Sequence, residues 1–337
     1  MRMLPQPVHP GLLRISVVVP TFHRLQLLRR CLEALLAQDF DPRAYEIVVV
    51  DDGHDDDVRT AVLAIATVVQ MPAIRYVRPP HGRGPACARN AGWHAAHAPI
   101  VAFTDDDTIP EPSWLAEGEA AMTDHPQWAA VAGQVIVPID EQRPPRDHER
   151  MVQGLATAEF VTANAFVRRG ALRRLGGFDE RFERAWREDS DLQFRLLEEV
   201  GPVGRSANAR VVHPVREMPW GVSLQQQRNT QFDALLYKKH PRLYRQRIRR
   251  VPPWDYYAVV ALTALGAPLA VAGETGWAAA ALAGAAALVL RFAWRRLRET
   301  DHSLRHVLEM VTTSALIPFV SVYWRLRGAL RFRVLFL

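Results

Sequence analysis

The chain has 337 residues, 49% of them hydrophobic and 23% charged, a composition typical of a folded protein with a large core. Its formal net charge is +6, and many of its arginines flank apolar stretches in the second half, which favours anionic lipid headgroups as a partner. These basic segments contain no nucleic-acid motif and no interleaved aromatic residues, so we expect no nucleic-acid partner.

The two cysteines, Cys31 and Cys87, fall on apolar helical faces. This placement predicts buried free thiols in a reducing compartment, not a disulfide or a metal pair. The first 13 residues contain three prolines and lack the apolar run of a signal peptide. We therefore expect residues 1–13 to form a tail and the soluble part of the protein to remain in the cytoplasm.

Buried strands alternate with amphipathic helices in the N-terminal part of the chain. The strands carry β-branched runs such as ISVVV and EIVVV, and the helices carry apolar side chains at helical spacing. The expected strands are residues 15–19, 46–50, 74–77 and 100–103, and the expected helices are residues 24–38, 55–69 and 85–96. This alternation predicts a doubly wound α/β sheet with right-handed crossovers.

The pattern continues with more strands and a polar loop. Two further strands are expected at residues 129–137 and 160–167, separated by a loop at 140–147 that is long enough to move near a ligand. A short helix at 170–175 precedes a longer one at 186–200. In the longer helix Leu192, Leu196 and Leu197 should face the core, which leaves acidic residues at its start.

Three expected strand ends carry polar residues: PTFHR at 20–24, DDG at 51–53 and DDD at 105–107. Ligands of open α/β sheets bind beyond the carboxyl ends of the strands, so these groups should converge at one edge. The three adjacent carboxylates repel one another unless a cation neutralises them, and Mg²⁺ or Mn²⁺ bound with phosphate oxygens would do so. A solvated acidic turn with aspartate as helix N-cap is the alternative, and this motif alone leaves both open.

Two further features have competing interpretations. Gly82 and Gly84 follow a strand and open a helix, but the third glycine of a dinucleotide-binding loop is missing. A tight turn that lets Arg89 approach a diphosphate is the better interpretation. Asp189, before an apolar helical run, is either a helix N-cap or a base held on a rigid element, and the sequence leaves these two roles open.

Taken in order, these motifs resemble those of family 2 glycosyltransferases with the GT-A fold. The segments that carry the resemblance are VVVPTFHR, VVVDDG, RGPACARNAG, FTDDDTIPEPSWL, GGFDERF and REDSDLQFRL, within residues 14–215. The resemblance implies a Rossmann-like, doubly wound mixed sheet in a catalytic domain at residues 14–245. Membrane helices would follow this domain.

The resemblance also implies roles for individual residues. Nucleotide-sugar binding is implied for Pro20, Thr21, Arg24, Asp52, Arg89, Asp105 and Asp106. A divalent cation, Mg²⁺ or Mn²⁺, is implied on Asp107, Asp105 and His213. Asp189 corresponds to the catalytic base, with Glu188 beside it.

The implied reaction is inverting transfer of a sugar from a UDP- or GDP-linked donor to a hydroxyl of a lipid-linked or membrane-proximal glycan. Processive members carry a Q-x-x-R-W motif, whereas here Gln225–Arg228 is followed by Asn229, which favours transfer of a single sugar. A non-catalytic nucleotide-sugar-binding subunit and a sugar nucleotidyltransferase are the alternatives. The nucleotidyltransferase lacks support because no glycine-rich, lysine-bearing loop follows the first strand.

The C-terminal part contains apolar stretches flanked by arginines. Residues 254–273 and 276–294 are each long enough to cross a bilayer core, which predicts a transmembrane hairpin within residues 246–298. A soluble helical pair is the alternative. Arginines on both flanks place both ends on the cytoplasmic side, as expected for an inner-membrane protein with a cytoplasmic catalytic domain. Within residues 299–337, the apolar stretch 307–324 is interrupted by Glu309 and Pro318. We expect an interfacial helix that lies along the membrane, and a third membrane span is the alternative.

Overall fold

The computed structural model describes residues 13–81, 84–140 and 142–336. Almost all of the expected N-terminal tail, and Gly82 of the expected tight turn, lie outside the described residues. The chain forms two compact units, which we describe separately: a first unit of residues 1–138 and 154–214, and a second unit of residues 139–153 and 215–337. The domain boundaries expected at residues 245 and 298 stay predictions.

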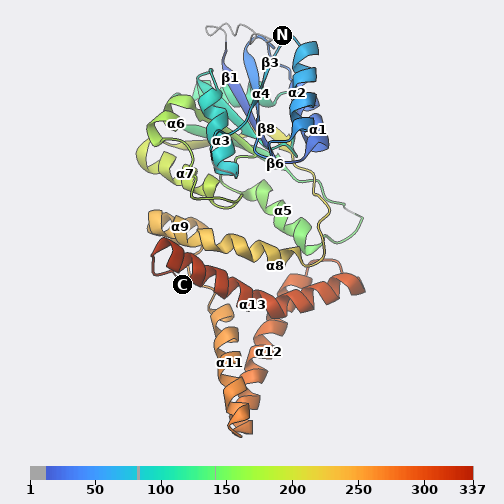
Figure 1. The fold of residues 1–337 in the computed structure, drawn as a ribbon, viewed down its shortest axis with the longest axis vertical. Helices are drawn as coiled ribbons and strands as arrows, with labels where there is room; N and C mark the ends of the chain where they lie inside the picture. Colours follow the sequence, from blue (N-terminus) through green and yellow to red (C-terminus); the bar gives the residue numbers. More distant parts are fainter. Residues whose placement is uncertain (1–12, 82–83, 141, 337) are drawn as a thin grey trace. The chain divides into compact units, whose positions relative to one another are not determined.

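The first unit is built on a mixed sheet with strand order β3-β2-β1-β4-β7-β6-β8-β5 (Figure 1). Its strands are β1 Ile15–Thr21, β2 Tyr45–Asp51, β3 Ala73–Val77, β4 Ile100–Thr104, β5 Ile109–Pro110, β6 Ala130–Ile136, β7 Asn164–Arg168 and β8 Val203–Val212. Strand β1 runs parallel to β2 and β4, whereas β7 runs antiparallel to β4 and β6. The carboxyl ends of β1, β2 and β4 therefore lie at the same edge of the sheet.

Helices cover both faces of this sheet. They are α1 Leu25–Leu36, α2 Asp56–Val68, α3 Pro85–Ala95, α4 Trp114–Asp124, α6 Arg169–Leu175 and α7 Glu188–Glu199. Side chains of α1, α2 and α4 share one hydrophobic cluster with the sheet, and those of α3, α6 and α7 share another. Strand β1 contributes Val17 and Val19 to the first cluster and Val18 to the second, because successive side chains of a strand point to opposite faces.

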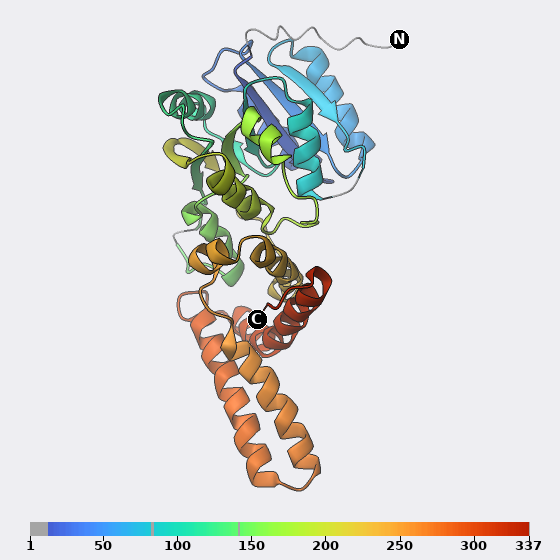
Figure 2. The same ribbon diagram turned by 90° about the vertical axis from the view of Figure 1, so that its left-hand side faces the viewer.

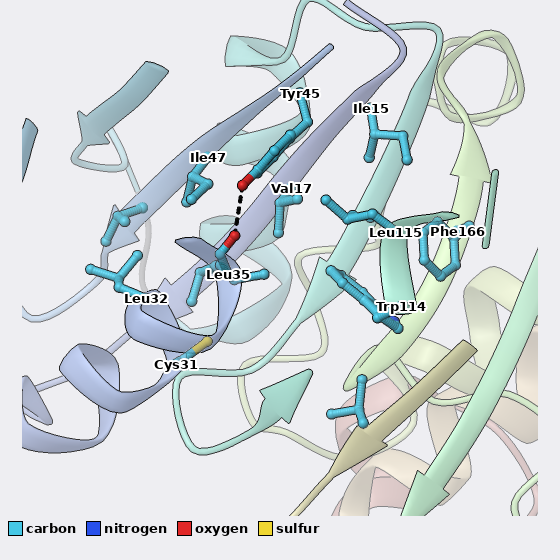
Figure 3. Packing of buried hydrophobic residues seen from close by; sticks show 14 of the residues in the cluster. Ile15, Val17, Cys31, Leu32, Leu35, Tyr45, Ile47, Trp114, Leu115 and Phe166 are labelled. Atoms are coloured by element: carbon cyan, nitrogen blue, oxygen red, sulfur yellow. Dashed lines mark hydrogen bonds between the residues drawn. The ribbon is translucent and has the colours of Figure 1, made fainter. Parts of the chain in front are cut away.

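Large side chains fill the first of these clusters (Figure 3). The rings of Trp114 and Phe166 are 5.0 Å apart between centroids, and both are fully buried. The hydroxyl of Tyr45 donates a 2.7 Å hydrogen bond to the carbonyl oxygen of Leu35, so this buried polar group is satisfied. This close packing holds the strands from which the polar edge residues project.

The structure refines several expectations about helix and strand ends. Helix α2 has Asp55 as its N-cap, as the acidic start of this helix predicts. The N-cap interpretation of the DDD motif is wrong, because α4 begins after Ser113. Asp189 is not an N-cap either, since it lies inside the first turn of α7, after Arg187. Cys31 and Cys87 are free and buried, as expected.

Several elements were not predicted from the sequence, among them β5, β8 and α5. Strand β5 has two residues, too few for a periodic signal. Strand β8 carries the polar segment GRSANAR, and most of its side chains are only partly buried. Helix α5, Asp147–Thr157, has no fully buried residue, so the expected mobile loop at 140–147 runs directly into a polar helix.

The second unit is helical. Its elements after α5 are α8 Val222–Gln226, η1 Gln227–Thr230, α9 Gln231–Lys239, α10 Pro241–Leu243, η2 Tyr244–Ile248, α11 Trp254–Val271, α12 Thr275–Leu297 and α13 Leu304–Phe332. Helices α11 and α12 lie side by side as an antiparallel hairpin, and α13 runs across its base (Figures 1 and 2). Among the described residues, α11, α12 and α13 are long and apolar enough to cross a membrane.

Helix α13 has two different faces. The face packed against α8, α9 and the hairpin is interrupted by polar groups, among them His306, Thr313, Ser314, Ser321 and Arg325. The exposed side carries large apolar residues at helical spacing: Leu304, Leu308, Val311, Phe319, Tyr323, Leu326 and Leu330. Glu309 and Pro318, which interrupt the apolar stretch, lie inside α13 and do not end the helix. An exposed apolar stripe is what an interfacial helix requires.

Candidate active site

The centre of the sheet edge is Asp106, from the DDD motif after β4. Its carboxylate accepts a 2.7 Å hydrogen bond from the hydroxyl of Thr21, at the end of β1, and a 3.2 Å bond from the guanidinium of Arg24. Burial raises the pKa of Asp106 to about 6. Pro20 precedes Thr21 in β1, opposite Val50 of β2. The structure thus brings together four residues that the sequence analysis assigned to donor binding.

The end of β2 supplies Asp51 and Asp52, whose carboxylates have different hydrogen-bond partners. Asp51 accepts hydrogen bonds from the backbone N–H groups of Gly53 and Asp55 and from the hydroxyl of Tyr76, so it shapes the turn. Asp52 accepts a 2.8 Å bond from the N–H of Gly84 through Oδ2. Its Oδ1 is buried and has no hydrogen-bond partner among the described residues. A buried carboxylate oxygen without a donor is what a ligand-binding acid presents.

Gly84 occupies a position that only glycine fills without strain. Its φ angle is +103°, and a Cβ atom there would lie 2.6 Å from the carbonyl oxygen of Glu183. The close approach lets the N–H of Gly84 reach Asp52. In the expected tight turn, the backbone N–H of Gly84 thus contacts Asp52, the acid expected to bind the nucleotide. Gly82 lies outside the described residues.

Arg89, on α3, connects the edge of the sheet with α7. Its guanidinium donates a 2.9 Å hydrogen bond to Asp105 and a 3.0 Å bond to Glu188, and only 5% of its side chain is exposed. Burial alone would lower the pKa of Arg89, but the charges of Asp105 and Glu188 raise it above the ordinary value. Arg89 therefore stays charged and holds an acid from β4 beside an acid from α7.

The two acids at the start of α7, Glu188 and Asp189, both have raised pKa values. Burial and the neighbouring charge of Asp189 raise the pKa of Glu188 to about 7. Burial also raises the pKa of Asp189, whose Oδ1 accepts a 2.6 Å hydrogen bond from the N–H of Ser190. The raised pKa values of both carboxyl groups lie closer to pH 7 than the ordinary values do. A carboxylate whose pKa is near the working pH accepts a proton well and is an effective general base.

Asp107 and His213 form the pair best placed for a cation. The Nε2 atom of His213, just after β8, lies 3.5 Å from Oδ1 of Asp107, and both side chains are largely buried. Asp105, the third expected ligand, contacts Arg89 instead. Among the described residues, no group of three or more His, Cys, Asp or Glu side chains is arranged to hold a metal ion. The donors present fit a hard cation that takes two protein ligands and completes its shell with phosphate oxygens.

Asn90 has a supporting role that the sequence analysis missed. Its side-chain oxygen accepts hydrogen bonds from the N–H of Phe178 and from the indole of Trp93, and its amide donates to the carbonyl of Phe178 and to Glu180. A Cβ atom on Gly177 would lie 2.4 Å from this amide, so only glycine fits there. Asn90 of the RNAG motif therefore contacts the GGFDERF motif directly. An asparagine next to Arg89 in a mostly apolar helix was the feature of the sequence that could have indicated this role.

Comparison with known proteins identifies the relatives of this chain. The profile described as Glycosyl transferase family 2 matches residues 16–182, and the profile described as Glycosyl transferase family group 2 matches residues 100–294. A Pre-mycofactocin glycosyltransferase of Mycobacterium tuberculosis is 30% identical over 223 residues, covering 62% of this chain and 44% of the relative. The Validoxylamine A glucosyltransferase of Streptomyces hygroscopicus subsp. limoneus is 30% identical over 217 residues, covering 54% and 47%.

A solved structure is similar in fold. It is the mannosyltransferase PcManGT of Pyrobaculum calidifontis in complex with GDP-Man and Mn²⁺, with a TM-score of 0.56, 21% identity, and coverage of 98% of this chain and 91% of the other. The expected GT-A fold with C-terminal apolar helices is confirmed. The chain spans less than half the length of the curated relatives described above.

Proposed function

This chain belongs to glycosyl transferase family 2, and from this premise we propose that it is an inverting, membrane-attached glycosyltransferase. It transfers a single sugar from a UDP- or GDP-linked donor to a hydroxyl of a lipid-linked or membrane-proximal glycan. The observation that carries the proposal is the bridge through Arg89, which joins Asp105 of the DDD motif to Glu188, the neighbour of Asp189. A donor-binding acid and a base are thereby held on one side of the first unit.

The donor is bound by the edge residues. We assign the nucleoside to Asp52, whose buried Oδ1 accepts hydrogen bonds from ribose hydroxyls or from the base. Arg24 compensates the charge of Asp106, and the hydroxyl of Thr21 donates a hydrogen bond to it, which keeps the edge compatible with a negatively charged donor. Arg89 donates to two acids already, so it positions Asp105 and Glu188 more than it contacts the diphosphate.

Asp189 is the general base. It removes the proton from the acceptor hydroxyl while that oxygen forms a bond to the anomeric carbon of the donor. The bond between that carbon and the diphosphate breaks on the opposite side, which inverts the configuration, and the nucleoside diphosphate leaves with the electron pair. Rigid placement on the first turn of α7 suits this step, because proton transfer requires a defined distance and angle.

Asp107 and His213 would hold the divalent cation, Mg²⁺ or Mn²⁺, with oxygens of the donor diphosphate completing its shell. When bound, such an ion stabilises the negative charge that grows on the leaving diphosphate. The protein's own contribution is to keep the Asp107 carboxylate next to the imidazole of His213 in a largely buried place. His213 supports this role through its Nδ1 atom, which is buried and has no hydrogen-bond partner among the described residues.

The second unit attaches the enzyme to the inner membrane. Helices α11 and α12 form a hairpin with most of its apolar surface exposed, and α13 presents its apolar stripe along the interface. Arg245–Arg250 precede the hairpin, and arginines at 291, 295, 296 and 298 follow its apolar part. This arrangement supports cytoplasmic termini, with the donor site facing the pool of nucleotide sugars.

A transfer assay tests the proposal directly. The full chain in phosphatidylcholine nanodiscs is incubated with radiolabelled UDP-glucose, UDP-galactose, UDP-N-acetylglucosamine or GDP-mannose, a bacterial envelope lipid extract, and Mn²⁺ or EDTA. We expect label to enter the organic phase with one donor and release of one nucleoside diphosphate per sugar transferred. Donor binding without transfer would instead support a non-catalytic subunit, and formation of a sugar nucleotide with pyrophosphate would support a nucleotidyltransferase.

A further inference from the structure

The second unit contains a cavity that the proposed reaction does not use. It has a volume of about 300 Å³ and lies among α5, the segment before α8 and the first turns of α13. All the residues that line it belong to the second unit. The volume is at the lower end of small-molecule sites, enough for a ligand of one or two rings.

The charges in the lining cancel. It contains four arginines and four acids. Arg143 pairs with Glu149 at 2.6 Å, and Asp147 pairs with Arg296, which approaches from α12, at 2.7 Å. Glu309 accepts a 2.7 Å hydrogen bond from the N–H of Gly221. A cavity with balanced charges favours neither an anion nor a cation, and among the described residues no group of three potential ligands holds a metal.

Two histidines supply hydrogen-bonding groups that the protein itself does not satisfy. His306, on α13, is 4% exposed, and its Nε2 atom has no hydrogen-bond partner among the described residues. The Nδ1 atom of His148, on α5, is also buried and without such a partner. Burial, followed by the charge of Arg216, lowers the pKa of His148, so its ring is neutral at pH 7. Neutral imidazoles donate and accept, and buried ring nitrogens need a partner.

An aromatic side chain stands at the same cavity. Trp220 is 44% exposed and lines the cavity together with Met218 and Met310. A half-exposed indole offers an apolar face on which the C–H face of a sugar ring packs while the ring hydroxyls reach polar groups.

We propose that this cavity binds a neutral sugar unit of the acceptor, stacked on Trp220 with its hydroxyls bonded to His306 and His148. Sugar hydroxyls are both donors and acceptors, so they match imidazole nitrogens and paired charges, whereas a phosphate would need a net positive lining. The inference rests on the proposed function for the class of ligand, because it gives the acceptor glycan a subsite on the second unit.

Saturation-transfer difference NMR on the full chain tests this proposal. The protein is placed in phosphatidylcholine nanodiscs, since detergents with sugar headgroups would compete. The probes are methyl glycosides of glucose, galactose, mannose and N-acetylglucosamine, with inorganic phosphate as a separate competitor. We expect saturation transfer to at least one glycoside, a loss of at least fivefold in Trp220→Ala and His306→Ala, and no competition by phosphate. Trp277→Ala, at a 72% exposed tryptophan outside the cavity, should retain the wild-type signal.

The outcomes separate this inference from the proposed function. Trp220→Ala removes a half-exposed side chain, so it tests the site even if His306→Ala fails to fold. Nucleoside diphosphate binding is measured on each variant, and we expect it unchanged. If the protein binds a glycoside but no nucleotide, the proposed function is contradicted, whereas the proposal for the cavity is not. Absence of glycoside binding, equal binding in Trp220→Ala, or displacement by phosphate would overturn the cavity proposal.

Discussion

The two units of this protein differ in how far their large apolar side chains are exposed. In the first unit Leu28 and Leu35 of α1 are completely buried. In the second unit Leu265 and Leu290 of the helical hairpin are 60% and 62% exposed. In water an exposed apolar surface of this extent is costly, so the solvent of the hairpin is best understood as lipid.

The polar residues show the complementary contrast. The first unit concentrates charge at the ends of buried strands, where each acid has a neighbour that fixes it, as Arg89 fixes Asp105 and Glu188. The second unit has its charges in compensated pairs around a cavity or on the flanks of apolar helices. This contrast supports our proposals that the reaction takes place in the first unit and that the second unit attaches the protein to the membrane and binds part of the acceptor.

Removing the base should have the largest effect. In Asp189→Asn the side chain keeps its size but no longer accepts a proton, so we expect turnover to fall by about 10²–10⁴-fold. Donor affinity, measured by calorimetry, should stay within about twofold of wild type. A variant that turns over at more than a tenth of the wild-type rate would show that another group is the base.

Removing the bridge should destabilise the first unit. Arg89→Ala leaves Asp105 and Glu188 close together without their common cation, a loss of about 3–5 kcal/mol for a buried pair. We expect the thermal midpoint, followed by tryptophan fluorescence, to fall by about 6 °C or more. Arg43→Ala, at an exposed arginine paired with Asp41, is the matched control and should leave the midpoint unchanged. Equal midpoints in both variants would contradict the bridge.

A charge on the exposed apolar surface should distinguish the two units. Leu265→Arg introduces a cation into α11 at a cost of about 2.5–3.5 kcal/mol if the helix crosses a bilayer. We expect a reduced fraction of the protein to resist carbonate extraction from membranes. Val68→Arg, at an 82% exposed position of α2 in the first unit, should leave that fraction unchanged. An unaffected Leu265→Arg would favour the soluble helical pair.

The smallest predicted effect concerns pH. The pKa of Glu188 is raised from 4.5 to about 7, so turnover should rise as the Glu188–Asp189 pair loses its protons, up to a pH near 7. Because the folded state holds that proton more tightly than the unfolded state, the raised pKa makes stability decline between pH 4.5 and 7. In Glu188→Gln the ionisation near pH 7 is lost, and Asp189 is the acid of this pair that is left to titrate.

We therefore expect the rising limb of the pH–rate profile of Glu188→Gln to move to lower pH by up to about one unit. Ser190→Ala retains both acids, so the rising limb of its pH–rate profile should shift by less than that of Glu188→Gln. A limb that moves to higher pH in Glu188→Gln would contradict the assigned coupling of the two acids.

Much of the sheet was predictable, because β1, β2 and β4 are continuous apolar runs that end in polar residues. The part of the sheet that follows β4 in the chain was harder to predict. Strand β8 is polar and partly exposed, and its pairing with β6 depends on contacts distant in sequence. The length of α13 was also hard to predict, because a proline inside a helix removes a backbone donor, yet α13 continues through Pro318 while it packs against α9 and the hairpin.

The candidate site was predictable in part for the same reason. Motifs at strand ends identify Thr21, Asp52 and Asp106, since parallel strands deliver them to one edge. The partners of Arg89 could not be predicted, because α3 and α7 are separated by about a hundred residues and only the fold brings them together. The structural role of Asn90 was hidden for the same reason.

The central claim is that the edge formed by β1, β2 and β4 binds a nucleotide sugar. Calorimetric titration of UDP and GDP, with Mn²⁺, into wild type, Asp52→Asn and Asp56→Asn tests it most directly. Asp52 has a buried, unpartnered oxygen, whereas the side chain of Asp56 is 84% exposed. The account predicts that wild type and Asp56→Asn bind one of these nucleotides equally, and that Asp52→Asn binds it about tenfold or more weakly. Equal binding by all three proteins, or no binding by wild type, would contradict it.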